Sequence, residues 1–259
     1  MILVVKLVLV PMLIALLTLA GARFGPRIAG VLTGLPVVAG PIVFFMALEQ
    51  GPAFAARSAT ATLAAFASLA AFCIVYAQAA LRVSWGTSTL LGWLAFVAAT
   101  LVLDRWAPPL EASIAVAVVA PMVILALTPR PELRPGATRV VSRAEVALRM
   151  LAGASLMLIL TGLAHVLGPR LSGLLTVFPV ATTILAVFAH RNDGAAFAIH
   201  LIRGLATALY SLAAFFVVLA LALDPLGVGP AFLCAGMAAV MMQSVALRTS
   251  ARGGIQSQA

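Results

Sequence analysis

The sequence predicts an all-α polytopic membrane protein with about nine transmembrane helices, arranged as two inverted four-helix repeats joined by one extra helix. Its 259 residues are 64% hydrophobic and 9% charged, with a mean hydropathy of +1.18, whereas a soluble domain carries about 25% charged residues. Apolar runs long enough to cross a bilayer core of about 30 Å recur along the chain. A long motif also occurs twice.

The duplicated motif is GPRIAGVLTGLPVVAG at residues 25–40, which returns as GPRLSGLLTVFPVATT at residues 168–183, an offset of 143. Without a gap, thirteen of the thirty-three positions in residues 25–57 are identical to those in residues 168–200. The chain is therefore predicted to be a tandem duplication.

Length and hydropathy predict nine membrane-spanning segments. They are residues 3–22, 28–48, 55–80, 86–103, 111–128, 146–166, 171–190, 197–222 and 228–247. The first ends in small residues like a secretory leader, but its counterpart, 146–166, lies in mid-chain, so it is kept as a helix of the mature protein. Segment 111–128 has no counterpart. Five crossings then precede the second copy, which predicts that the repeats are inverted.

This pattern divides the chain into four parts. Residues 1–106 form repeat 1, residues 107–143 hold the connecting helix and a cytoplasmic linker, residues 144–249 form repeat 2, and residues 250–259 form a disordered tail. The linker region, residues 128–145, contains three prolines and four arginines, which end a helix and favour water.

The net charge of +9 comes from fifteen arginines and one lysine against seven carboxylates. The basic residues lie between apolar runs and not along one face, which argues against nucleic acid as a partner. With the linker inside, twelve of the sixteen basic residues are cytoplasmic, which predicts an external N-terminus and a cytoplasmic C-terminus. The Arg-, Ala- and Gly-rich composition fits a GC-rich bacterial coding sequence, and the apolar composition makes the lipid bilayer the partner. Homo-oligomerisation is left open.

Two prolines are predicted to interrupt the second and seventh segments. Pro36 has no amide hydrogen to pair with the carbonyl of Leu32, and Pro179 does the same to Leu175. Broken helices are tolerated in a bilayer only where protein or water covers them, and inverted-repeat transporters bind solutes there. The candidate solute-binding residues are Thr33, Pro36, Gly40, Thr176, Pro179, Thr182 and Thr183.

Close helix packing is the alternative interpretation of the same residues. Gly30 and Gly34 form a small-xxx-small face that allows two helices to approach. The hydroxyls of Thr33 and Thr176 would then bond to their own helix backbone.

Five basic side chains are candidate vestibule or relay groups. Arg27 and Arg170 begin the second and seventh segments and either reach the headgroups or attract an anionic solute. Arg57 and His200 occupy equivalent positions, and His200 is either a solvated helix-start residue or a proton relay. Arg203 lies one turn further into the membrane, where a charge suggests function.

Chemistry-bearing patterns are scarce. All seven carboxylates lie in predicted loops or at helix ends, which disfavours a buried-carboxylate proton pump and a metal site. Cys73 and Cys234 are not repeat-equivalent, so a disulfide is not expected. No catalytic motif is present, so the sequence predicts no enzyme and no cofactor.

The run IAGVLTGLPVV followed by EQG in the first copy, and Phe178 with Pro179 in the second, resembles the GlpM-like small inner-membrane proteins. The likeness covers about the first two helices of each half, and this chain departs from the family by tandem fusion and an extra helix. The resemblance implies a bacterial cytoplasmic-membrane protein and no assigned chemistry.

The sequence therefore predicts a permease that moves a small solute by alternating access between the second and seventh segments. One alternative is a non-transporting scaffold or lipid-binding protein, which requires a dry and tightly packed centre. Another is a membrane-embedded enzyme, which requires polar catalytic groups in one cavity.

Overall fold

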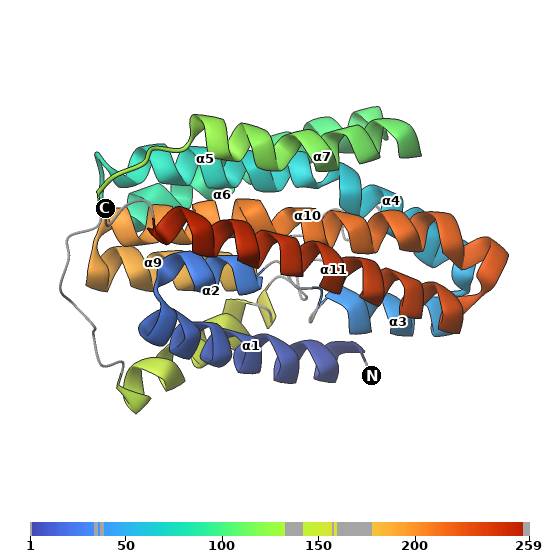
Figure 1. Ribbon diagram of the computed structural model, residues 1–259, viewed down its shortest axis with the longest axis horizontal. Coiled ribbons are helices and arrows are strands. Elements are labelled where there is room, and N and C mark those ends of the chain that lie inside the picture. The colour runs from blue at the N-terminus through green and yellow to red at the C-terminus, as the bar shows by residue number, and fades with distance from the viewer. Residues whose placement is uncertain are drawn as a thin grey trace.

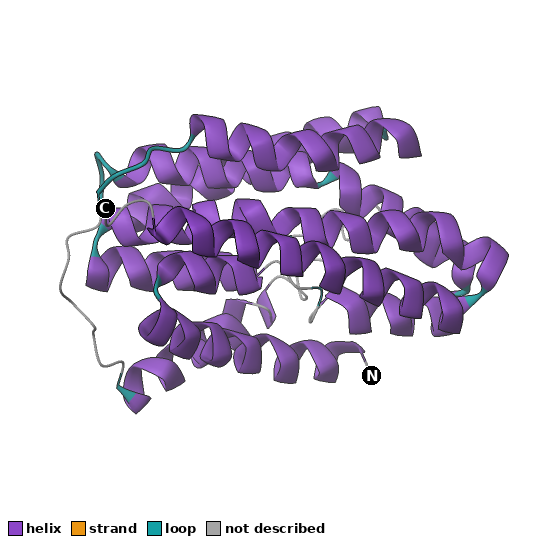
Figure 2. Ribbon diagram, in the orientation of Figure 1, coloured by secondary structure: helices purple, strands orange, loops and turns teal. Residues whose placement is uncertain are grey.

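A computed structural model of the chain describes residues 2–33, 36, 39–132, 142–156, 158–159 and 178–255. Over these residues every regular element is a helix, as the composition predicts. The helices are α1 (Ile2–Phe24), α2 (Pro26–Thr33), α3 (Ala39–Gln50), α4 (Pro52–Ala64), α5 (Phe66–Ala80), α6 (Trp85–Trp106), α7 (Leu110–Leu127), α9 (Val180–Asp193), α10 (Ala195–Leu226) and α11 (Val228–Ile255). Residues 143–156 are also helical. Figure 2 shows these helices joined mostly by short loops.

Five stretches of the described chain are long and apolar enough to cross a bilayer. They are Pro52–Ala80, Trp85–Trp106, Leu110–Leu127, Ala195–Leu226 and Val228–Val245. Their outward faces carry large apolar side chains that water would not favour but acyl chains would. The chain is therefore a multi-pass membrane protein by the length and composition of its helices.

The helices pack side by side into one bundle, with α10 at its centre (Figure 1). α10 contacts α2, α4, α5, α7, α9 and α11. With 32 residues and a rise of about 1.5 Å each, it exceeds the bilayer core in length. The matching stretch of the first copy is divided at Ala65, where α4 ends and α5 begins.

Helix boundaries of the two copies recur at the offset of 143 residues. The matched boundaries are Gln50 with Asp193 at the ends of α3 and α9, Pro52 with Ala195 at the starts of α4 and α10, and Trp85 with Val228 at the starts of α6 and α11. Gly51 and Gly194 lie between these helices with φ of 90° and 91°. A side chain is strained at such φ values, so both turns favour glycine.

The predicted segments differ from the structure in two places. Segment 28–48 is two helices, α2 and α3, as the interruption predicted at Pro36 requires. Segment 55–80, predicted as one helix, is two, α4 and α5. At the C-terminus, α11 continues to Ile255 and so enters the predicted tail. Segments 146–166 and 171–190 and the linker lie partly outside the described residues.

Candidate functional site

The first break lies between α2 and α3. α2 ends at Thr33, α3 begins at Ala39, and Pro36 lies in a turn between them. The carbonyl of Pro36 accepts a hydrogen bond from the amide of Gly40 at 2.8 Å. The interruption that a proline predicts here is therefore present, because Pro36 cannot donate the bond that would continue α2.

The helix before this break rests directly on the backbone of α10. A Cβ atom on Gly30 would lie 2.0 Å from the carbonyl oxygen of Leu201, 2.8 Å from the amide nitrogen of Leu205 and 3.0 Å from the Cα of Gly204. No side chain larger than a hydrogen fits this approach. Close packing through small residues, the alternative expected from the sequence, accounts for Gly30.

Side chains bind the carbonyl groups near the end of α2. The hydroxyl of Thr33 donates to the carbonyl of Ala29 at 2.8 Å, as the packing alternative expects. The amide Nε2 of Gln243, from α11, donates to the carbonyl of Val31 at 2.8 Å. Gln243 is only 4% exposed, and its Oε1 has no hydrogen-bond partner among the described residues. A distant helix therefore completes the last turn of α2.

The position of this break is near the middle of the bundle. Val31, fully buried, packs against Ala208 of α10, and a Cβ on Gly40 would lie 3.5 Å from the ring of Phe215. Ala208 and Phe215 lie on either side of the midpoint of α10. Figure 1 shows α2 and α3 end to end along the bundle, with the interval between them away from both ends.

The second copy places its proline at a similar depth. Pro179 is buried and immediately precedes α9. The ring of Phe178 packs against Phe96 and Trp93, with centroids 5.2 and 5.7 Å apart, and Trp93 Nε1 donates to the hydroxyl of Thr183 at 3.3 Å. Trp93 and Phe96 belong to the middle of α6, so the start of α9 is also buried at mid-bundle.

Threonines at the start of α9 are buried as well. Thr182 and Thr183 are 4% and 2% exposed. Leu175 and Thr176, which precede the proline, lie outside the described residues. The role predicted for Thr176 therefore stays a prediction.

α2 and α9 meet in one apolar cluster. Leu32, from the last turn of α2, packs against buried residues of three other helices, among them Leu185 of α9. The other members are Leu13 and Leu17 of α1 and Leu201 of α10. The end of α2 and the start of α9 are therefore neighbours inside the bundle, although 147 residues separate Thr33 from Val180.

One of the predicted relay groups binds the end of α7, and another binds the chain that follows it. Arg203 Nη1 donates to the carbonyls of Leu125 and Thr128 and to the Thr128 hydroxyl, each at 2.9 Å. Nε2 of His200 lies 2.8 Å from the carbonyl of Pro131 and so carries the donated hydrogen. A cation at a helix C-terminus offsets the partial negative charge there. Through these contacts Arg203 and His200 hold the end of α7 and the chain after it against α10, which is a structural role.

Of the three other basic residues predicted as vestibule or relay groups, the structure describes the side chain of Arg57. Arg57 is exposed in the second turn of α4. The side chain of Arg27 and the whole of Arg170 lie outside the described residues, so the vestibule assigned to them stays a prediction.

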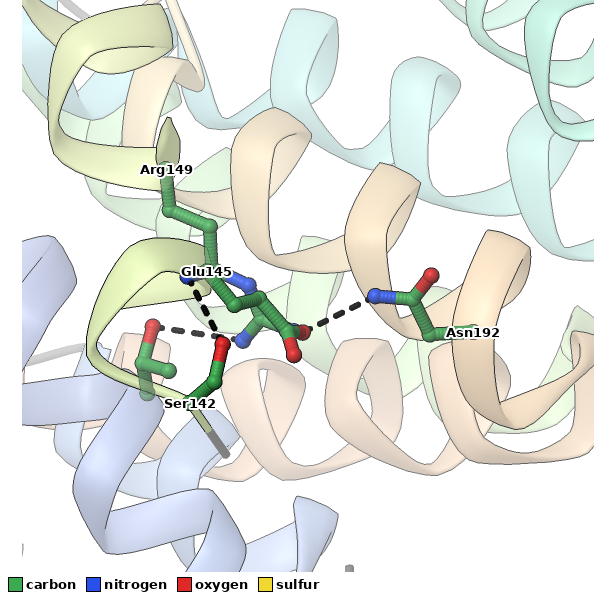
Figure 3. A network of polar contacts seen from close by, with 5 residues as sticks. Ser142, Glu145, Arg149 and Asn192 are labelled. Atoms are coloured by element: carbon green, nitrogen blue, oxygen red, sulfur yellow. Dashed lines mark hydrogen bonds and ion pairs between the residues drawn. The ribbon is translucent and has the colours of Figure 1, made fainter. Parts of the chain in front are cut away.

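A second polar cluster joins α1, α9 and the helix at residues 143–156 (Figure 3). Arg149, 6% exposed, donates to Glu145 in an ion pair and to the hydroxyl of Thr18 at 3.3 Å. Asn192 donates to the same carboxylate at 2.9 Å. The guanidinium also lies over the ring of Phe188, 5.0 Å from its centroid. This buried pair holds the three helices together.

Sequence reasoning overlooked both Gln243 and Arg149 as organising residues. Gln243 is an amide inside the apolar run 228–247, and a polar group at that position is itself a signal. Arg149 stands four residues after Glu145, a spacing that pairs charges on one helix. Neither pattern identifies the partners that come from other helices.

Other chemistry is limited in the part of the chain that the structure describes. No three His, Cys, Asp or Glu side chains gather there as metal ligands. Cys73 and Cys234 are free thiols, with Cys73 buried. Comparisons of the chain with known protein families, with curated proteins and with solved structures find no match.

Proposed function

We propose that the chain is a permease that moves a small solute across the bacterial cytoplasmic membrane by alternating access. In this proposal the two copies are inverted halves, the N-terminus is external and the C-terminus is cytoplasmic. The solute binds between the α2–α3 break and the start of α9, and one half rocks against the other. The protein has no enzymatic activity and needs no cofactor in this mechanism.

The meeting of the α2–α3 break with the start of α9 at mid-bundle carries this proposal. Helix ends leave backbone groups without helical partners, which is costly in hydrocarbon, so a break and a helix start buried together need a common reason. Buried polar groups accompany both: Gln243 at the end of α2, and Trp93 with Thr183 at the start of α9. Such groups fix the orientation of a small polar solute in a mostly apolar site.

The directions of the helices support the inverted arrangement. In Figure 1 the colour runs along α4 and α5 in the direction opposite to that along α10, its equivalent in the second copy. α6 and α11, also equivalents, run in opposite directions as well. A pseudo-twofold axis in the membrane plane would relate two halves built in this way.

A static scaffold or lipid-binding protein is the second candidate. The close contact of Gly30 with α10 and the bond from Thr33 to its own helix favour it, since both suit a tightly packed centre. The two candidates differ in one physical property. A permease admits water to the breaks in at least one of its states, and a scaffold does not.

Thiol accessibility tests this difference. Single cysteines at Thr33 and Thr182 are placed in a chain that lacks Cys73 and Cys234, and cells are treated with a membrane-impermeant maleimide. For a permease we expect both positions to react, at rates that change when transport conditions change. A cysteine at Leu233, which is 71% exposed on the lipid-facing side of α11, is the matched control and should stay unreactive.

The outcome separates the two functions. Absence of reaction at both test positions, with a cysteine at Ala107 reacting normally, removes the permease proposal and leaves the scaffold; Ala107 is exposed in the loop between α6 and α7, which the proposed topology places outside. Reaction of the Leu233 cysteine would show that the reagent reaches acyl-chain depth, so the test positions would then be compared by rate.

A further inference from the structure

We infer that the end of α2 and Gln243 form a binding site for an inorganic monovalent cation, which would be the coupling ion of the transport cycle. The inference deepens the proposed function and, in its assignment of coupling, rests on it. Binding of the ion itself requires only the local geometry described below.

The unpartnered oxygen of Gln243 is the first observation. Nε2 of this side chain donates to the carbonyl of Val31 at 2.8 Å, which fixes the orientation of the amide group. Oε1 belongs to the same group and therefore lies beside the end of α2, buried and without a hydrogen-bond partner among the described residues. Burying an acceptor in this way is unfavourable unless something with positive charge or a donated hydrogen meets it.

The end of α2, which Nε2 contacts, also presents acceptors. Pro36 has no amide hydrogen to give to the carbonyl of Leu32. The hydroxyl of Thr33 donates to Ala29 on the other face of α2 and takes no part in the site. The C-terminal end of a helix adds about half a negative elementary charge. A group that satisfies this set must be a cation or a strong donor.

The charge of the ion follows from the carboxylates. α2 and α11 contain no Asp or Glu, and α10 has only Asp224, in its last turn. Ca²⁺ and Mg²⁺ sites in proteins rely on carboxylate oxygens. Carbonyl and amide oxygens without a carboxylate suit a single positive charge, and broken-helix transporters hold Na⁺ with such groups.

The first copy lacks an equivalent feature. Thr100 stands at the position that matches Gln243, and it donates to the hydroxyl of Ser68 at 3.0 Å. Ser211, the match of Ser68, donates instead to the carbonyl of Ala239 at 2.7 Å. In the first copy Thr100 and Ser68 bond to each other, whereas in the second copy the amide of Gln243 bonds to the backbone of α2. The inference predicts one cation site per chain.

Thermal unfolding of the full-length protein in nanodiscs tests the site. Ionic strength is held constant while choline chloride is replaced by NaCl, KCl or methylammonium chloride, and tryptophan fluorescence reports Tm. We expect Na⁺ or K⁺ to raise Tm in a saturable way, by about 5–10 °C at 100 times Kd. Methylammonium distinguishes a binding site for an amine from one for a metal ion.

Two variants of Gln243 make the test specific. Gln243→Met removes both amide atoms and should abolish the response. Gln243→Lys keeps a donor for Val31 and puts a positive charge in place of the ion, so it should fold normally yet no longer respond. Ser244→Ala is the matched control, because Ser244 is exposed one residue further along α11 and bonds only within its helix. It should respond like the wild type.

Several outcomes would overturn the site. They are an equal Tm in all four salts, a rise with methylammonium alone, or a full response in Gln243→Lys. Failure of the permease proposal is distinguishable. If Na⁺ or K⁺ raises Tm through Gln243 while the Thr33 and Thr182 cysteines never react, the ion site is supported and the permease proposal is refuted. If the cysteines react and no salt changes Tm, the permease proposal is supported and the ion site is refuted.

Discussion

Replacement of Gly30 by alanine tests the contact that positions the first break. The new Cβ would lie 2.0 Å from the carbonyl oxygen of Leu201, whereas non-bonded atoms prefer about 3.5 Å. The obstructing atoms belong to the backbone of α10, which cannot rotate away as a side chain can. α2 must therefore move away by about 1.5 Å, the difference between these distances.

The cost of this movement has two parts. Overpacking a fitted interface costs about 1–3 kcal/mol. The bond from Gln243 to the carbonyl of Val31, now 2.8 Å, would lengthen beyond hydrogen-bonding range, which removes about 1 kcal/mol more. The better helix propensity of alanine returns up to about 1 kcal/mol. The net expectation is a loss of about 1–3 kcal/mol, or a Tm lower by about 3–10 °C.

Thermal unfolding of Gly30→Ala in nanodiscs, followed by tryptophan fluorescence, measures this loss. Gly236→Ala is the matched control, because Gly236 lies within α11 and a Cβ there would meet nothing within 4 Å. It should leave Tm unchanged or raise it slightly. A Gly30→Ala protein as stable as this control would show that α2 does not rest on α10 as described. The assignment of Gln243 would then lose its basis.

Three further substitutions probe the other buried polar contacts, each measured as a change in the free energy of unfolding. Arg203→Met leaves the last carbonyls of α7 without their donor and should cost about 2–3 kcal/mol, whereas a loss below 0.5 would mean that water replaces it. Trp93→Phe keeps the ring contacts but removes the bond to Thr183, so about 1 kcal/mol is expected, and more than 3 would indicate a packing role. Arg149→Met removes the cation beside the carboxylate of Glu145, which is 11% exposed and keeps Asn192 as a donor, and should cost about 3 kcal/mol, most of which the double variant with Glu145→Gln should restore; no restoration would contradict the ion-pair account.

The division of the second predicted segment followed from one residue, because the missing amide hydrogen of Pro36 is a local chemical fact. The chain in fact breaks between Thr33 and Ala39. Hydropathy similarly located the five long spans, since burial in lipid needs only length and composition. Such features depend on neighbours in sequence. They can be predicted without knowing which helices touch.

Contacts between distant helices could not be predicted in the same way. Gln243 reaches Val31 across 212 residues, and the bond depends on how deeply α11 and α2 pass each other. Arg203 was expected to be functional because an intramembrane charge is costly, but the carbonyl groups that satisfy it belong to α7. A sequence shows that a buried polar group needs a partner. The packing of the helices decides which partner it has.

The unmatched helix α7 is bound at its C-terminal end by both copies, and this limits how the halves can move. Arg203 of α10 holds the carbonyls of Leu125 and Thr128, while Gln78 of α5 donates to the carbonyl of Leu127 at 3.1 Å. One binding residue comes from each copy, and all the bonds fall within one helical turn. In the proposed permease, rocking of one half against the other would turn about this end of α7 or break these bonds. Since the α2–α3 break and the start of α9 lie at mid-bundle, away from such a pivot, a small rotation there would move α2 and α9 relative to each other while α7 stays attached.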